Sequence, residues 1–98
     1  MAISNSNTLS SDYLQDNKFL KEGRRSLREE PIRVSESGER FLKYFAENAS
    51  EDGVLFKTIK EITTDLNIPH QSLTKVLKIL EHDEIIYRRN GIIGLWKE

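Results

Sequence analysis

The sequence predicts a small α+β domain that is mainly helical, with three helices, one short strand and a C-terminal β-hairpin. Residues 69–82 carry an apolar and a polar stripe at the same helical spacing, on nearly opposite sides of one helix. The pattern at 58–61 is typical of a capping box. Two β-rich runs are joined by Asn90-Gly91, a strong hairpin signal. With 98 residues, the chain suffices for one domain of modest core, which we expect at 35–98.

We expect residues 1–34 to form a flexible tail. Residues 1–11 are rich in Ser, Asn and Thr, a composition typical of disorder. A short helix is predicted at 12–20, and its apolar side chains either pack on their own domain or make dimer contacts. A basic stretch follows and is a candidate DNA arm, although such stretches more often only keep a tail soluble. The candidate dimer contacts are Tyr13, Leu14, Phe19 and Leu20, and the arm residues are Arg24, Arg25 and Arg28.

The first helix of the domain is predicted from a serine cap at Ser35 or Ser37 to about Asn48. A turn signal at 52–53 separates it from a short strand at 54–56. The apolar side chains of this helix fall on one broad face that we expect to be packed: Phe41, Leu42, Phe45, Ala46 and Ala49.

The second helix is predicted to start at Thr58 and to end at Asn67. Pro69 cannot extend it, but proline suits the first turn of a following helix. That third helix runs to about residue 82. Its inner stripe is Leu73, Val76, Leu77 and Leu80, and its outer stripe, which contains no acid, is Gln71, Thr74, Lys75 and Lys78.

The C-terminal hairpin is predicted to pair 85–89 with 92–96. We expect a type I′ turn at Asn90-Gly91, which requires positive φ at both residues. Trp96 is expected to close the core beside the first helix. Arg88 and Arg89 flank the turn, where they either contact nucleic acid or protect a sheet edge from pairing.

In this order of elements, residues 37–98 resemble a winged helix-turn-helix domain of bacterial and archaeal transcription regulators. The closest similarity is to regulators of the multiple-antibiotic-resistance type. Two positions depart from that pattern: Asn67 replaces a small residue in the helix-turn-helix turn, and Glu84 replaces a glycine after the third helix. The segments that carry the resemblance are 59–68, 73–81 and 84–89.

The resemblance implies a sequence-specific, DNA-binding transcriptional regulator. Its third helix would read the major groove of double-stranded DNA and its wing would contact the backbone or minor groove. A homodimer is expected, because one winged helix buries little DNA surface. The alternative is a protein-interaction module in a replication, transcription or other multi-subunit assembly. The candidate DNA-binding residues are His70, Gln71, Ser72, Thr74, Lys75, Lys78, Arg88, Arg89 and Asn90.

The composition restricts other functions. The chain has 15 basic and 16 acidic residues, so any attraction to DNA must come from local arrangement. There is no cysteine, and no membrane-length apolar run or signal peptide is visible, which favours a cytoplasmic protein. His70 and His82 are too far apart to suit adjacent-turn metal ligands. No phosphate loop, nucleophile motif or carboxylate pair appears, so we expect neither an enzyme nor a cofactor, and no effector pocket is recognisable.

Overall fold

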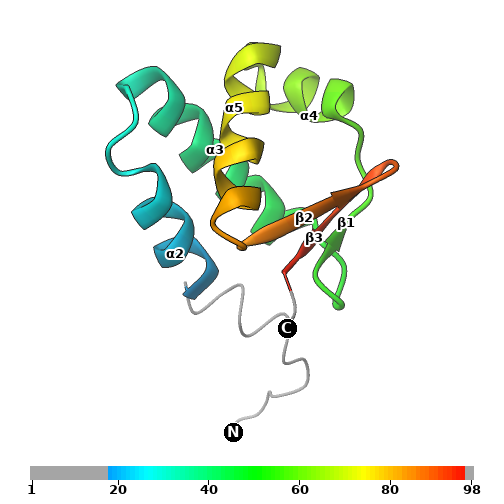
Figure 1. Cartoon of the computed structure of the whole chain (residues 1–98). Helices are drawn as coiled ribbons and strands as arrows, with labels where there is room; N and C mark the ends of the chain where they lie inside the picture. The colour runs from blue at the N-terminus through cyan, green and yellow to red at the C-terminus, as the bar shows by residue number, and fades with distance from the viewer. Residues whose placement is uncertain (1–17, 97–98) are drawn as a thin grey trace, which may run out of the picture.

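The computed structural model describes residues 18–96 and has an α+β fold that is mainly helical, as the sequence predicts (Figure 1). Among the described residues, four helices pack together, and a small three-stranded antiparallel sheet lies at one end of them. In the described range, none of the helices combines the length and the apolar character that crossing a membrane requires. The elements are α2 (Lys18–Leu27), α3 (Ile32–Asn48), β1 (Val54–Leu55), α4 (Ile59–Leu66), α5 (His70–His82), β2 (Ile86–Arg89) and β3 (Ile92–Leu95).

Helix α2 is part of the packed domain, so the prediction of a flexible tail is wrong for residues 18–34. Phe19 is 0% exposed, and its ring centroid lies 5.0 Å from that of Phe45 in α3. Leu20 and Leu27 are buried in the same core. Phe19 and Leu20 therefore pack on their own domain and do not provide a dimer contact. The other predicted dimer contacts, Tyr13 and Leu14, lie outside the described residues.

Helices α2 and α3 approach closely because each has a glycine facing the other. A Cβ atom on Gly23 would overlap the side chain of Leu42, and one on Gly38 would overlap that of Leu27. Each glycine thus makes room for a leucine of the opposite helix. This reciprocal packing explains why residues 18–27 form a docked helix.

Helix α3 starts earlier than the serine-cap pattern predicts. Its N-cap is Pro31, and no side chain caps this end. Ser35 lies inside the first turns, where its hydroxyl donates to the carbonyl of Ile32 at 3.2 Å, and Ser37 is buried. Because α2 is folded, the α2–α3 turn decides where α3 begins, and proline suits such a start.

The predicted capping box and the predicted turn between the second and third helices are confirmed. The Glu61 amide donates to the Thr58 hydroxyl at 3.1 Å, and the Thr58 amide donates to the Glu61 carboxylate at 2.8 Å. Asn67 ends α4 in the left-handed region with φ 54°, a conformation that asparagine tolerates better than most residues. Pro69 then precedes α5.

Helix α5 ends in a Schellman motif whose left-handed residue is a glutamate. The amide of Ile85 donates to the carbonyl of Leu80 at 2.9 Å, and that of Glu84 donates to Glu81 at 3.0 Å. Glu84 has φ 60°. Glycine is usual at this position, because a side chain disfavours the left-handed region. The departure that the sequence shows at 84 is therefore a site of backbone strain.

The sheet has the order β1-β3-β2, with both pairs antiparallel. Its inner face buries Leu55, Ile86 and Ile93 against the helices. The hairpin is confirmed, but its predicted turn type is wrong: Gly91 has φ 73° whereas Asn90 does not have positive φ. A type I′ turn needs positive φ at both central residues, so this turn is of another type.

Trp96 does not close the core, contrary to the prediction. It remains 42% exposed beyond the end of β3. The space beside α3 is occupied instead by Phe19 of α2, in contact with the Phe45 ring. The sequence-based expectation failed because α2 was not expected to contribute to the core.

Candidate nucleic-acid interface

The outward face of α5 presents fewer of the predicted DNA-binding residues than the sequence indicates. Gln71, Lys75 and Lys78 are exposed, as is His70 at the start of the helix. Ser72 is only 8% exposed, so its proposed contact with a base is wrong. It lies one turn before Val76, on the buried side of the helix.

Thr74 is only partly accessible to solvent on this face of α5. It is half-buried, and its hydroxyl is shielded from solvent with no hydrogen-bond partner in the described part of the chain. A hydroxyl that is already shielded cannot reach a base edge without a change of rotamer. The exposed polar stripe of α5 is therefore narrower than its sequence spacing predicts.

A groove of about 630 Å³ runs between the outward face of α5 and the end of α2. We call it the α2–α5 groove. Its lining from the α2 side includes Ser26 and Glu30. From α5 and its C-terminal cap the lining comprises His70, Gln71, Thr74, Lys75, Lys78, Ile79, His82 and Asp83.

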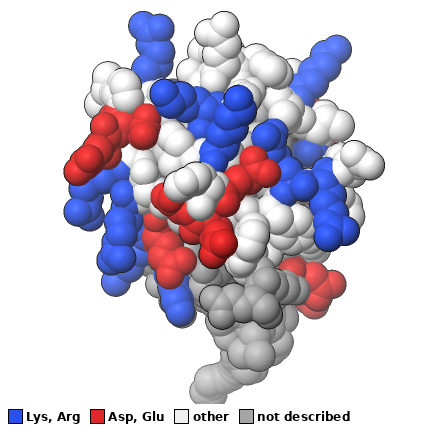
Figure 2. Space-filling model, in the orientation of Figure 1, with Lys and Arg blue, Asp and Glu red and all other residues white. Residues whose placement is uncertain are grey.

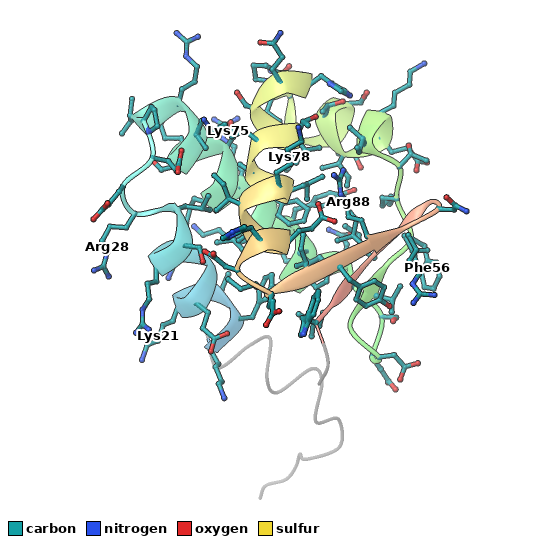
Figure 3. The ribbon with its side chains drawn as sticks, in the orientation of Figure 1. Lys21, Arg28, Phe56, Lys75, Lys78 and Arg88 are labelled. Atoms are coloured by element: carbon teal, nitrogen blue, oxygen red, sulfur yellow. The ribbon has the colours of Figure 1, made fainter. Side chains whose placement is uncertain are left out.

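Acidic groups partly neutralise the cations of the α2–α5 groove. The Lys75 ammonium lies 3.9 Å from a carboxylate oxygen of Glu30, on the side of α5 that faces the α2–α3 connection (Figure 3). A hydrogen bond from the Ser26 hydroxyl, followed by one from His82, lowers the pKa of Asp83. Figure 2 shows the result: acidic side chains lie within this face, among basic side chains.

A second groove, of about 640 Å³, lies between the start of α4 and the hairpin. We call it the α4–hairpin groove. Its charged lining comprises four cations and one acid. These residues are Lys57, Lys60, Glu81, Arg88 and Arg89, and the neighbouring lining includes Thr58, Asn90 and Gly91.

The single acid of the α4–hairpin groove is already paired. The Arg88 guanidinium donates from Nε to a Glu81 carboxylate oxygen at 3.0 Å, with both side chains half-buried. Arg88 therefore braces the hairpin against α5, as its position between them shows (Figure 3). Lys57, Lys60 and Arg89 have no acid opposite them within this lining. Their ammonium and guanidinium groups suit phosphate oxygens.

Sequence reasoning missed Lys57 and Lys60, although it found Arg89 and Asn90. Both lysines flank Thr58, the cap of α4. A signal was present in principle, since the capping box places residue 60 in the first helical turn. Only the three-dimensional structure, however, shows that this turn faces the hairpin tip.

The predicted DNA arm is not supported. Arg24 is held by Glu39 of α3 through two hydrogen bonds, from Nε at 2.8 Å and from Nη2 at 2.5 Å. These bonds raise the pKa of Arg24 and lower the pKa of Glu39. Arg25 and Arg28 are exposed, but they share a groove with four acids. Those acids are Glu22, Glu29, Glu30 and Asp83.

Within residues 18–96, no group of three or more His, Asp or Glu side chains is arranged to hold a metal ion. Comparisons of the chain with protein-family models, with curated proteins and with solved structures gave no match.

Proposed function

We propose that this protein is a sequence-specific DNA-binding transcriptional regulator with a winged helix-turn-helix domain. In this proposal α3, α4 and α5 form the three-helix core and β2–β3 the wing. The observation that carries the proposal is the α4–hairpin groove. It places three unneutralised cations beside α5, whose exposed stripe contains no acid.

In this proposal the start of α5 and the α4–hairpin groove contact different parts of the DNA. The start of α5 enters the major groove, where the Gln71 amide can pair with adenine in bidentate fashion. Lys57, Lys60 and Arg89 contact phosphates of the flanking backbone. Arg88 acts indirectly, because its bond to Glu81 orients the hairpin relative to α5.

We further propose that two copies bind together on DNA. A single domain of this size reads too few base pairs for high specificity, and a dimer doubles the contacted surface. The buried Phe19 and Leu20 cannot supply the interface. Sedimentation of the protein alone and of its DNA complex measures the stoichiometry, and one copy per site would contradict this part of the proposal.

One observation favours the alternative, a protein-interaction module. The α2–α5 groove combines Lys75 and Lys78 with Glu30 and Asp83 around the half-buried Ile79. Mixed charge around an apolar floor suits a peptide better than a polyanion. In that case α5 would contact a partner protein in place of a base pair.

Binding of the full chain to a random duplex pool, measured against salt concentration, separates the two functions. For a DNA reader, affinity falls as salt rises. Lys60→Ala and Arg89→Ala should weaken binding across all sequences and each reduce the logarithmic salt slope by about 1. No binding at low salt would contradict the proposal.

Base readout is tested by Gln71→Ala with Ser72→Ala as its matched control. Loss of a bidentate contact costs about 1–3 kcal/mol of discrimination. Gln71→Ala should therefore broaden the sequences selected from the pool with little change in mean affinity. Ser72 is buried beside it, so Ser72→Ala should leave the selected sequences unchanged. Equal effects of both variants would place base readout elsewhere.

A further inference from the structure

The outer face of the sheet, turned away from α5, is apolar and aromatic. Side chains alternate between the two faces of a strand. Since Leu55, Ile86 and Ile93 point inward, their neighbours along each strand point outward. We call this the aromatic sheet face, and its residues are Val54, Phe56, Tyr87, Arg89, Ile92, Gly94 and Trp96.

Two of its aromatic side chains are unusually accessible. Phe56 is 68% exposed and Trp96 is 42% exposed. In Figure 3, Phe56 lies beside the hairpin and points away from α5. Within residues 18–96, Ile32 is the other large hydrophobic residue with such exposure, and it stands alone at the start of α3. Exposure of two aromatic rings on one face of a sheet indicates a binding surface.

The third aromatic ring lies flat across the middle of this face. A Cβ atom on Gly94 would overlap the ring of Tyr87, so the glycine lets that ring lie on the neighbouring strand. The Arg89 guanidinium carbon lies 6.0 Å from the centre of the Tyr87 ring. A cation thus sits directly beside an aromatic plane.

The charges at the hairpin end of this face are complementary to a polyanion. The outward strand positions carry no acid, and the charged residue among them is Arg89. Arg89 also lines the α4–hairpin groove with Lys57 and Lys60. Cations therefore border the hairpin end of the aromatic sheet face.

We propose that the aromatic sheet face binds single-stranded nucleic acid. Unpaired bases stack on the exposed rings of Phe56 and Trp96, while Arg89, held over the Tyr87 ring, and the adjacent lysines hold the phosphates. Stacking of this kind tolerates any sequence, because every base has a π face. A protein partner would fit exposed aromatic rings too, but it gives no reason for acid-free strands beside a cluster of cations. This site goes beyond duplex reading: the bases stack on the outer face of the sheet, and only the phosphate-binding cations of the α4–hairpin groove are shared with the proposed duplex site.

The full chain can be tested with a twelve-nucleotide oligothymidylate at low salt. Trp96 is the single tryptophan of the sequence, so a base stacked on it should quench the intrinsic fluorescence. We expect a dissociation constant of roughly 10⁻⁵ M or tighter that weakens with salt. Anisotropy of a labelled oligonucleotide gives the affinity independently of the tryptophan.

Phe56→Ala and Ile32→Ala form a matched pair, because both remove an exposed apolar side chain. Phe56→Ala should weaken oligothymidylate binding by roughly fivefold or more, and Ile32→Ala should leave it unchanged. Circular dichroism and the urea midpoint check that both variants fold. Tyr87→Phe, which keeps the ring over Gly94, should retain binding.

Three outcomes would overturn the proposal: no quenching and no anisotropy change with the wild-type chain, equal losses for Phe56→Ala and Ile32→Ala, or a change in sedimentation for Phe56→Ala without loss of oligothymidylate binding. The last result would identify the face as a contact between copies. Gln71→Ala distinguishes this proposal from duplex reading. It should alter the duplex sequences selected and leave oligothymidylate binding intact, so that either function can fail alone.

Discussion

The two grooves that flank α5 have nearly the same volume, about 630 and 640 Å³, but the α2–α5 groove has balanced charges whereas the α4–hairpin groove is cationic. In the α2–α5 groove, Lys75 faces Glu30, and Asp83 adds a second carboxylate. In the α4–hairpin groove, the one acid, Glu81, is occupied by Arg88. The comparison teaches that a lysine presents positive charge to a ligand only to the extent that the fold keeps acids away from it.

Charge reversal in the α4–hairpin groove should have the largest effect. Lys60→Glu combined with Arg89→Glu replaces two phosphate contacts by two repulsions. We expect duplex affinity at low salt to fall about 100-fold, or about 2.7 kcal/mol. Fluorescence anisotropy measures this loss.

The matched control is Lys21→Glu, on α2 and far from the hairpin (Figure 3). It should change affinity far less than the double variant. If the double variant keeps its affinity and Lys75→Glu with Lys78→Glu abolishes binding, the comparison of the two grooves is reversed.

The C-terminal end of α5 positions both grooves. Relieving the backbone strain at Glu84 should change the stability of the fold and leave the affinity for DNA unchanged. Glu84→Gly removes the side chain from a left-handed residue and should stabilise the protein by about 1 kcal/mol. The midpoint of urea unfolding should therefore rise. Glu84→Ala keeps the strained Cβ and serves as the control. If glycine is no more stable than alanine here, Glu84 is not strained.

Neutralising Glu30, one of the two acids of the α2–α5 groove, should make the two grooves more alike. Glu30→Gln leaves Lys75 without its carboxylate partner, and we expect duplex affinity to rise about threefold. Glu29→Gln changes the net charge equally at an exposed neighbour and is the control. If both variants raise affinity by the same factor, only overall charge matters and the Glu30–Lys75 pair does not.

The smallest effect concerns the Arg24–Glu39 ion pair, which joins α2 to α3. Helix α2 forms one wall of the α2–α5 groove. The Arg24 guanidinium lowers the pKa of Glu39 in the folded protein. The ion pair therefore stabilises the fold at pH values above the pKa that Glu39 has in the unfolded chain, and this stabilisation is lost as the pH falls through the pKa of Glu39 in the folded protein. Because both side chains are partly exposed, screening limits the contribution to about 0.5 kcal/mol. Glu39→Gln should cost this much at neutral pH and nothing in acid.

Urea unfolding of Glu39→Gln and of the exposed control Glu36→Gln, at neutral and acidic pH, measures that difference. A cost for Glu39→Gln that persists after the carboxylate is protonated would show that packing, rather than charge, joins α2 to α3.

Much of the fold could be predicted from local patterns. The capping box at Thr58, the proline before α5 and the hairpin around Gly91 are each decided by a few neighbouring residues. Helical periodicity also identified the buried stripe of α5. These predictions succeeded because hydrogen bonds and allowed backbone angles within a short segment determine them.

The docking of α2 could not be predicted in this way. It depends on Gly23 and Gly38 meeting leucines of the opposite helix, contacts between residues more than ten positions apart. Once docked, α2 buries Phe19 and Leu20, while Trp96 stays at the surface. The errors about the tail and the dimer contacts therefore have one physical cause, the docking of α2.

The sequence by itself determined α4, α5, the hairpin and the polar stripe of α5, because each follows from local periodicity and turn chemistry. Tertiary structure alone decided which cations remain unneutralised. It brought Glu30 to Lys75 and joined Lys57 and Lys60 to Arg89. Electrostatic attraction depends on distances between residues remote in sequence, and only the packed fold sets those distances.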